Sequence, residues 1–374
     1  MLRILYVVDS LVIFGGMERV LTDKMRWLTE QGDCQVFLLT INQGTHPLVF
    51  PLPPKVEHGD LNVQIHRKYR YSGLRRLREE LYLRRLFRRR LREAFAAWQP
   101  DVIVCSRLDH VGAVLHVKGS IPLVFESHNS YMAYRFERYS WLKRLRFRYC
   151  LYQLKQSQMV VALTEGDAAE WRKRVPHVEV IPNPVDGNTT GRYSDLTAKS
   201  AIFVGRYTYQ KDVDALLRIW QQVHQQHPDW QLHIYGDYDG RMDHLVADAK
   251  RRDADIVVHE PTTAILEAYL QSSVLLLTSR YEPFGLVLPE AMSCGVPVVS
   301  FDCPYGPADI ITDGRDGFLV PRHDETAFVR RVSQLIENPS LRQEMGQEGI
   351  LSAHRYSAEV IMPKWIKLFQ TVHG

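Results

Sequence analysis

The segment Glu282-Pro-Phe-Gly-Leu-Val-Leu-Pro-Glu290, which continues as Ala291-Met-Ser-Cys-Gly295-Val-Pro-Val-Val299, is the most informative part of this sequence. It follows the apolar run Val274–Thr278, which has the length of a buried strand. Within it we expect a helix over Leu286–Cys294 and a further strand over Val298–Phe301. This order of strand, loop, helix and strand is typical of an α/β protein with a parallel sheet covered on both faces.

The two glutamates of this segment lie in different parts of that unit. Glu282 is in the loop, Glu290 is within the helix, and Gly285 stands where the helix begins. A glycine lets a ligand approach the backbone closely, and the free N–H groups of a helix N-terminus bind phosphate. Carboxylates at these two places can accept hydrogen bonds from sugar hydroxyls. The alternative is a surface loop and a helix stabilised by its own acidic residues.

The same alternation runs through the rest of the chain. We expect helices at Gly16–Glu30 and Asp212–His227, and strands at Leu2–Val8, Gln35–Thr40, Val102–Cys105, Leu123–Glu126, Met159–Leu163, Val178–Ile181, Ala201–Val204, Gln231–Tyr235 and Ile256–Val258. A polar connector near Pro182–Thr190 separates two series, and 374 residues exceed the size of a single core. The sequence therefore predicts two doubly wound α/β domains, residues 1–185 and 186–357, whose ligands bind beyond the carboxyl ends of the strands.

Composition limits the class of protein. The apolar fraction of 45% suits a chain that buries cores, and no run approaches the roughly 18 apolar residues of a membrane-spanning helix. Met1–Gly16 is interrupted by Asp9 and has no small-residue cleavage site, so it fits a buried strand better than a signal peptide. The five cysteines are scattered and form no Cys-x-x-Cys pair, so neither a zinc site nor a disulfide framework is indicated, and a reducing cytoplasm suits them.

A second cluster of charged residues follows the first strand of the second domain. The loop Gly205-Arg206-Tyr-Thr-Tyr-Gln-Lys211 carries two cations five residues apart, between a strand and a helix. Two such cations can converge on one diphosphate and stabilise its charge as it leaves. The alternative is a pair of solvated loop charges.

These motifs resemble the retaining glycosyltransferases of family 4, whose fold is called GT-B. Members carry Glu-x7-Glu followed by Ala-Met-x-x-Gly-x-Pro-Val-Val, as Glu282 to Val299 does here. The resemblance implies that Glu282 contacts the donor sugar and that Glu290 contacts the ribose of the nucleotide. It also implies that the backbone of Phe284, Gly285 and Leu286 lines the donor sugar and its phosphates.

The resemblance extends to the basic loop. Family members bind the diphosphate with the same Gly-Arg…Lys arrangement, so Arg206 and Lys211 inherit that role. The residue after this lysine is usually glycine in the family, whereas here it is Asp212, which we expect to cap the following helix.

The resemblance also suggests roles for two weaker motifs. Gly15-Gly16 follows the first strand and lacks the Gly-x-Gly-x-x-Gly pattern of dinucleotide binding. Family members have a comparable loop facing the donor phosphates and the acceptor. His128 ends a predicted strand within Glu126-Ser-His-Asn129 and would alone be taken as structural. In the family a histidine at this strand end points toward the donor sugar, which favours His128 as catalytic and leaves Glu126 and Asn129 as lesser candidates.

Asp237-Tyr238-Asp239 has the form of a metal-binding Asp-x-Asp motif found in a different glycosyltransferase fold. It directly follows the strand Gln231–Tyr235 and Gly236, so we interpret it as a turn-rich loop near the nucleotide. We predict that neither a metal nor another cofactor takes part, the nucleotide sugar being a substrate.

The charge of the chain is unevenly distributed. Residues 1–185 hold 29 Lys and Arg against 18 Asp and Glu, whereas the remainder holds 18 against 25. Leu74–Trp98 combines nine arginines with apolar residues at near-helical spacing, and Tyr131–Lys155 is a second basic, aromatic segment. Basic amphipathic helices suit an anionic membrane surface. A helix packed by its apolar stripe with arginines in water explains the same pattern, and nucleic acid, which we do not expect as a partner, could use the same charge.

The sequence thus predicts a retaining, metal-independent glycosyltransferase with His128, Arg206, Lys211 and Glu282 as catalytic residues. We expect UDP, or next GDP, in the donor, and a glycan or a sugar linked to polyprenyl pyrophosphate as the acceptor. A helix over residues 358–374 would return to the first domain, and the enzyme would be cytoplasmic or peripheral on the inner membrane face. The alternatives are a nucleotide-sugar 2-epimerase of the same fold and a non-catalytic protein that binds membrane or nucleic acid through its basic face.

Overall fold

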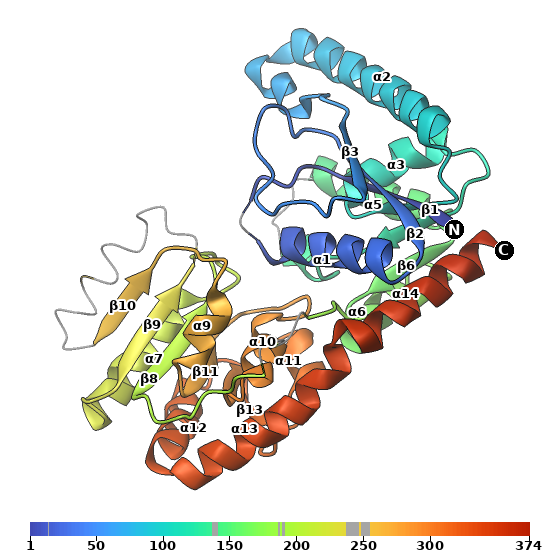
Figure 1. Cartoon of the computed structure of the whole chain (residues 1–374). Helices are drawn as coiled ribbons and strands as arrows, with labels where there is room; N and C mark the ends of the chain where they lie inside the picture. Colours follow the sequence, from blue (N-terminus) through green and yellow to red (C-terminus); the bar gives the residue numbers. More distant parts are fainter. Residues whose placement is uncertain (14, 137–140, 186–187, 189–190, 237–246, 248–254) are drawn as a thin grey trace. The chain divides into compact units, whose positions relative to one another are not determined.

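The structure of the chain is a computed structural model that describes residues 1–13, 15–136, 141–185, 188, 191–236, 247 and 255–374. It consists of two compact units (Figure 1). Unit 1 comprises Met1–Pro184 together with Ile361–Gly374, and unit 2 comprises Val185–Val360. Each unit has its own parallel sheet and its own hydrophobic core.

The described part of unit 1 contains a seven-stranded sheet in the order β3-β2-β1-β4-β5-β6-β7, with parallel neighbours throughout. Its strands are β1 (Leu2–Val8), β2 (Cys34–Thr40), β3 (Val56–Asp60), β4 (Val102–Cys105), β5 (Leu123–Glu126), β6 (Met159–Ala162) and β7 (Val178–Val180). The central strands are buried on both faces, which requires the continuous apolar runs seen in the sequence. The strand order reverses between β1 and β4.

The helices of unit 1 cover this sheet. They are α1 (Gly16–Glu30), the 3₁₀ turn η1 (Ile65–Arg70), α2 (Gly73–Trp98), α3 (Leu108–Val117), α4 (Ala133–Phe136), α5 (Trp141–Leu154), α6 (Glu165–Arg172) and most of α14 (Ala358–His373). The basic helix α2 packs on the core through four residues spaced four apart, Leu83, Phe87, Leu91 and Phe95. Its first turns contribute nothing to that core, and Leu74, Leu77 and Leu81 are exposed.

In unit 2 the described strands form a six-stranded parallel sheet in the order β10-β9-β8-β11-β12-β13. They are β8 (Ser200–Val204), β9 (Gln231–Tyr235), β10 (Ile256–His259), β11 (Val274–Leu277), β12 (Val298–Phe301) and β13 (Gly317–Val320). The helices are α7 (Val213–Gln226), α9 (Ile265–Leu270), α10 (Val287–Ser293), α11 (Gly306–Ile310), α12 (Glu325–Glu337), α13 (Pro339–Ala353) and the 3₁₀ turn η2 (His354–Tyr356). Here the order reverses between β8 and β11.

Both sheets therefore have the doubly wound order, and the predicted fold class, α/β with two such units, is confirmed. In sheets of this kind, ligands bind where the strand order reverses, because the loops on the two sides diverge and leave a crevice at the carboxyl edge. The loops after β8 and β11 are the places to examine in unit 2, and those after β1 and β4 in unit 1.

Candidate functional site

The loops after β8 and β11 bring a lysine and a glutamate together in unit 2. The Nζ of Lys211 lies 2.6 Å from Oε1 of Glu282, and the Glu282 carboxylate is almost fully buried. Ser279 donates its hydroxyl to the same oxygen at 2.5 Å, and the Gln210 side chain approaches the other oxygen at 3.4 Å. Because β8 and β11 are adjacent strands, residues 71 positions apart in sequence meet at one point of the sheet edge.

Hydrogen bonds to backbone carbonyl oxygens hold the two loops together. The Thr278 hydroxyl donates to the carbonyl oxygen of Lys211 at 3.1 Å, and the N–H of Arg280 donates to the carbonyl oxygen of Gln210 at 2.7 Å. The aliphatic stem of Lys211 passes over Gly205, where an added Cβ would lie 3.2 Å from its Cδ and Cε. Glycine at 205 thus gives Lys211 the space to reach Glu282.

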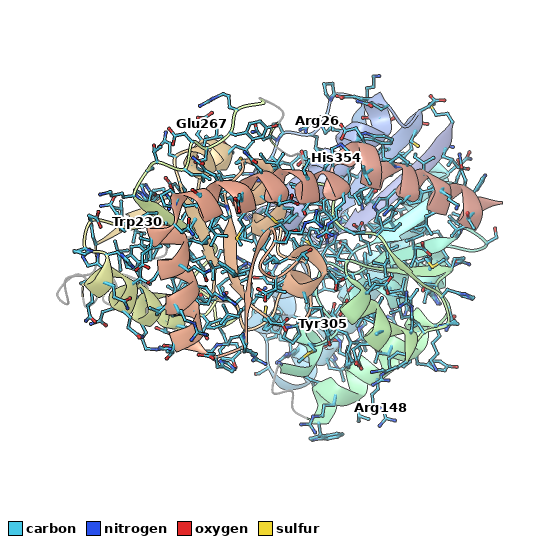
Figure 2. All side chains as sticks on the ribbon, turned by 90° about the horizontal axis from the view of Figure 1, so that it is seen from below. Arg26, Arg148, Trp230, Glu267, Tyr305 and His354 are labelled. Carbon is cyan, nitrogen blue, oxygen red and sulfur yellow. The ribbon has the colours of Figure 1, made fainter. Side chains whose placement is uncertain are left out.

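A third loop, before α11, holds the backbone of Glu282. The N–H of Glu282 donates to Pro304, and the N–H groups of Tyr305 and Gly306 donate to the carbonyl oxygen of Glu282. Tyr305, labelled in Figure 2, lies in this loop. Three loops from one sheet edge therefore fix the position of one carboxylate.

The glycine after Phe284 is required by the backbone. Gly285 has φ of +96°, in the region that side-chain-bearing residues rarely adopt, and α10 begins two residues later. The Phe284 ring is buried edge-on against Tyr356, with ring centroids 5.3 Å apart. Phe284 thus directs its side chain into unit 2. Phe284 and Gly285 are buried, whereas Leu286 is partly exposed.

Glu290 lies on α10 and is buried. It accepts a hydrogen bond of 2.9 Å from the hydroxyl of Tyr269 in α9. The structure thus brings Lys211 and Glu282 into contact, and it places Tyr269 against Glu290.

Arg206 is exposed at the start of the β8–α7 loop and has no ion pair with another described residue. It shares this loop with Lys211, whose ammonium is already paired. An unpaired cation beside a paired one at the carboxyl edge of a sheet is a suitable arrangement for a polyanionic ligand.

The expectation that Asp212 caps α7 is wrong. Asp212 stands directly before the helix but has a left-handed backbone, with φ of 47° and ψ of 53°, and its side chain makes no capping hydrogen bond. A cap requires an extended backbone that turns the side chain back over the free N–H groups. The Asp212 carboxylate instead accepts a hydrogen bond of 2.7 Å from Nη2 of Arg280.

In unit 1, His128 is buried at the carboxyl end of β5 in a cluster of polar groups. The Nζ of Lys24, on α1, lies 2.5 Å from Oε1 of Glu126 and 3.4 Å from the centre of the Trp365 ring of α14. His128 Nε2 lies 3.5 Å from the same Glu126 oxygen, and neither ring nitrogen has a hydrogen-bond partner among the described residues. Burial lowers the pKa of His128 despite the opposing effect of Glu126, so the ring is neutral at neutral pH.

A further polar cluster marks the reversal of strand order in unit 1. Asp9, which follows β1, has its Oδ1 within 2.6 Å of Asn42 Nδ2 and 3.2 Å of His110 Nε2 on α3. Burial would raise the pKa of Asp9, but the hydrogen bonds and charges of its neighbours, His110 first, hold it below its usual value. Gly15 and Gly16 lie nearby in sequence, where the loop after β1 leads into α1.

Sequence reasoning did not single out several of these residues: Gln210, Ser279, Arg280, Lys24, Asp9, Asn42 and His110. Two signals were available. Ser279 and Arg280 directly follow the apolar run that became β11, so they had to lie at the carboxyl edge of the sheet. Lys24 lies in the apolar stripe of α1 between Leu21 and Leu28, and a charged residue in such a stripe needs a buried partner.

The Asp237–Asp239 motif lies outside the described residues. In the part of the chain that the structure describes, no three His, Cys, Asp or Glu side chains are grouped so that they could hold a metal ion. All five cysteines are free and buried.

The basic segments of unit 1 form an exposed surface with apolar residues in it. On α5, Trp141, Leu145, Tyr149 and Tyr152 recur every three or four residues and are each more than half exposed. Arg148 on the same helix points outward (Figure 2). Arg146 of α5 pairs with Asp109 of α3. On α2, Leu74 and Leu77 are exposed. None of the helices among the described residues is long and apolar enough to cross a bilayer.

Two family models together match most of the chain. Residues 193–351 match the family described as Glycosyl transferases group 1, and residues 14–188 match Glycosyltransferase Family 4. The first match contains Arg206, Lys211, Glu282 and Glu290, and the second contains His128.

Individual proteins agree with these matches. The amylovoran biosynthesis glycosyltransferase AmsD of Erwinia amylovora is 37% identical over 220 residues, which are 56% of this chain and 61% of that protein. The lipopolysaccharide 1,6-galactosyltransferase of Escherichia coli is 34% identical over 167 residues, 42% of each chain. The chain thus spans less than two thirds of these curated relatives.

A solved structure shows the same fold over the whole chain. A mutant of TarM from Staphylococcus aureus, in complex with UDP, fondaparinux and α-GlcNAc-glycerol, has a TM-score of 0.80. The alignment covers 99% of this chain and 100% of TarM at 16% identity. A likeness at this identity shows the fold alone, and that fold is the predicted GT-B fold.

Proposed function

We propose, because the chain belongs to glycosyltransferase family 4, that it transfers a sugar from a nucleoside-diphosphate sugar to a glycan or lipid-linked acceptor in glycan or polysaccharide assembly. The observation that carries the proposal is the meeting of Lys211 with Glu282 where the strand order of unit 2 reverses. An ammonium for a diphosphate and a carboxylate for sugar hydroxyls stand there in contact. Arg206, which forms no ion pair among the described residues, lies on the same loop.

Each residue has a role that follows from its chemistry. Arg206, Lys211 and the N–H groups at the start of α10 take up the charge of the departing diphosphate. Glu282 accepts hydrogen bonds from the donor sugar, and Glu290 accepts them from the ribose. In unit 1, we assign His128, whose ring nitrogens have no hydrogen-bond partner among the described residues, to the reacting sugar.

We propose that the anomeric configuration is retained. The bond between the anomeric carbon and the phosphate oxygen breaks, the acceptor oxygen attacks from the same face, and the departing phosphate oxygen takes the proton of the acceptor. This route needs neither a protein nucleophile nor a metal, because the cations of the basic loop neutralise the leaving group. A product of inverted configuration would refute it.

UDP is the nucleotide we propose first and GDP second. The TarM structure and two others of this fold, of HepE from Anabaena, contain UDP, which supports this order. For the acceptor we propose a glycan or a sugar on polyprenyl pyrophosphate, bound by unit 1. Asp9, held by His110 and Asn42, offers its second carboxylate oxygen to an acceptor hydroxyl.

A thermal melt tests the donor site. UDP at 100 times its dissociation constant should stabilise the folded protein by about 2.7 kcal/mol and raise the melting midpoint accordingly. Arg206→Ala should abolish most of this rise, because Arg206 is proposed to bind the diphosphate. Arg330→Ala, which removes an exposed arginine of α12, is the matched control and should leave the rise intact. EDTA should not change it if no metal takes part.

The melt also tests the donor site and metal independence separately. No rise with UDP, GDP or ADP would contradict the proposed donor site. A rise that vanishes in EDTA would contradict metal independence while leaving the nucleotide site in place.

We further propose that unit 1 associates with an anionic membrane on its cytoplasmic face. The exposed stripe of α5, the exposed leucines of α2 and the arginines around them combine apolar contact with positive charge, as interfacial helices do. Basic residues near such a surface contribute about 1 kcal/mol each. An enzyme that uses a lipid-linked acceptor would meet its substrate there.

Vesicle sedimentation tests this proposal. The protein should sediment with vesicles of phosphatidylcholine and phosphatidylglycerol, less with phosphatidylcholine alone, and less as salt rises. Trp141→Ala with Tyr149→Ala should weaken binding about tenfold, because both side chains are exposed and would enter the interface. Leu351→Ala, an exposed residue of α13 in unit 2, should have no effect. Equal binding by the double variant and the wild type would contradict this surface.

A further inference from the structure

Two ion pairs of opposite direction lie next to each other between the loops after β8 and β11. Lys211 pairs with Glu282, and the next residue, Asp212, pairs with Arg280. In the first pair the cation comes from the β8–α7 loop, and in the second it comes from the loop after β11. The proposed chemistry uses the first pair and gives no role to the second.

Asp212 holds its place against its backbone preference. Its φ of 47° lies in the left-handed region, which glycine adopts without strain and aspartate tolerates less well. Asp212 is also buried, although its carboxylate caps no helix. A buried carboxylate on a strained backbone requires a compensating interaction, and Arg280 provides it.

Arg280 contacts the β8–α7 loop at three positions. Its N–H donates to the carbonyl oxygen of Gln210, its guanidinium lies 4.2 Å from the centre of the Tyr209 ring, and its Nη2 donates to Asp212. The hydrogen bond to Asp212 raises the pKa of Arg280, which keeps the guanidinium charged. Arg280 thus contacts the residues directly before and directly after Lys211.

We propose that Asp212 and Arg280 form a brace that positions Lys211 and Glu282 for the nucleotide-sugar donor without touching it. The inference rests on the proposed function. A bound diphosphate draws the Lys211 ammonium toward itself and weakens its pairing with Glu282. The brace then holds the two loops together by an ion pair that the ligand does not use, so that the site stays formed when the donor is bound.

Substitutions at the two ends of the brace give a specific pattern. Asp212→Gly removes the carboxylate and relieves the positive φ, so the unliganded protein should melt at or above the wild-type midpoint. Its dissociation constant for UDP, measured by titration calorimetry, should nevertheless rise about tenfold, the worth of one charge-assisted hydrogen bond. Arg280→Gln should weaken UDP binding similarly.

The double variant separates a brace from two independent contacts. Asp212→Gly with Arg280→Gln should bind UDP no more weakly than either single variant, because each change already breaks the same pair. Asp212→Asn, which can still accept the hydrogen bond, should recover part of the affinity. Arg315→Gln is the control. It breaks the surface pair of Arg315 with Glu348 before β13, at the opposite sheet edge, and should not change UDP binding.

Three outcomes would overturn the brace. Wild-type UDP affinity in Asp212→Gly, losses that add up in the double variant, or a lowered melting midpoint with unchanged affinity would each show that the pair does not position the site. If the wild-type protein itself bound no UDP or GDP, the proposed donor site would fail first, and the brace with it.

Discussion

Replacing Lys211 with alanine should lower kcat/KM for sugar transfer by about 10²- to 10³-fold, the loss measured when a charge-stabilising donor is removed from an active site. The ammonium of Lys211 lies at the point where the loops after β8 and β11 meet, 2.6 Å from Glu282. Its removal takes a cation from the proposed diphosphate site. It also leaves the Glu282 carboxylate, which Ser279 and Gln210 still contact, facing the incoming phosphates with its full negative charge. The rate would be measured with a UDP-sugar as donor.

A second substitution tests this explanation. Lys211→Ala combined with Glu282→Gln should bind UDP more tightly than Lys211→Ala alone, because the repulsion between carboxylate and phosphate is gone. Sugar transfer by the double variant should stay low, since Glu282 is proposed to contact the donor sugar. Lys199→Ala is the matched control, because Lys199 pairs with Asp229 on the surface of the same unit. A Lys211→Ala variant with wild-type kcat/KM would contradict the assigned role.

The parts of the fold that the sequence predicted best are those set by burial alone. Leu2–Val8, Val102–Cys105 and Leu123–Glu126 were expected as strands, and the structure has them with those bounds. Each is buried on both faces, so its apolar run is continuous and its ends are sharp. The strand β3, Val56–Asp60, was not expected, because it is an edge strand with partly exposed polar residues and has no such run.

The sequence predicted the position of each site residue on its own loop but not the contacts between the loops. The position of Lys211 on a strand-to-helix loop and of Glu282 after a strand could be inferred from the order of elements. Their contact depends on β8 and β11 being neighbours, which no local pattern states. The error at Asp212 has the same origin. An aspartate directly before a helix favoured a cap, but its carboxylate instead binds Arg280, which lies 68 residues away in the sequence.

The buried pair of Lys24 and Glu126 in unit 1 is the clearest example of a contact that local sequence patterns do not predict. The α1 stripe of Val20, Leu21, Met25 and Leu28 indicates which face of the helix is buried, and Lys24 lies within it. Its partner, Glu126, is 102 residues away on β5, and the ring above it, Trp365, comes from the last helix of the chain. Only the folded structure places the three together.

Replacing Glu126 with alanine should destabilise unit 1 by about 3–5 kcal/mol, because removing one partner of a buried ion pair leaves the other charge uncompensated. Lys24 is fully buried, and its ammonium donates a hydrogen bond to the Glu126 carboxylate at 2.5 Å. The contact of its ammonium with the Trp365 ring remains in the variant but does not replace an anion. The loss would be measured as the change in the free energy of unfolding by urea. Glu165→Ala, which removes a largely exposed partner of Arg172, is the control and should cost less than about 1 kcal/mol.

The pH dependence of this loss has a definite sign. Burial lowers the pKa of Lys24 below its ordinary value of 10.5, while Glu126 opposes that shift. Without Glu126 the pKa of the folded state falls further, so below pH 10.5 the unfolded chain binds more protons at Lys24 than the folded variant does. Stability of the variant therefore rises with pH in this window, and its deficit relative to wild type should shrink between pH 7 and pH 9.5. Lys24→Met with Glu126→Gln, which removes both charges, should recover most of the lost free energy at pH 7. A deficit that stayed constant with pH and persisted in this double variant would mean that Glu126 stabilises unit 1 by packing and not by its charge.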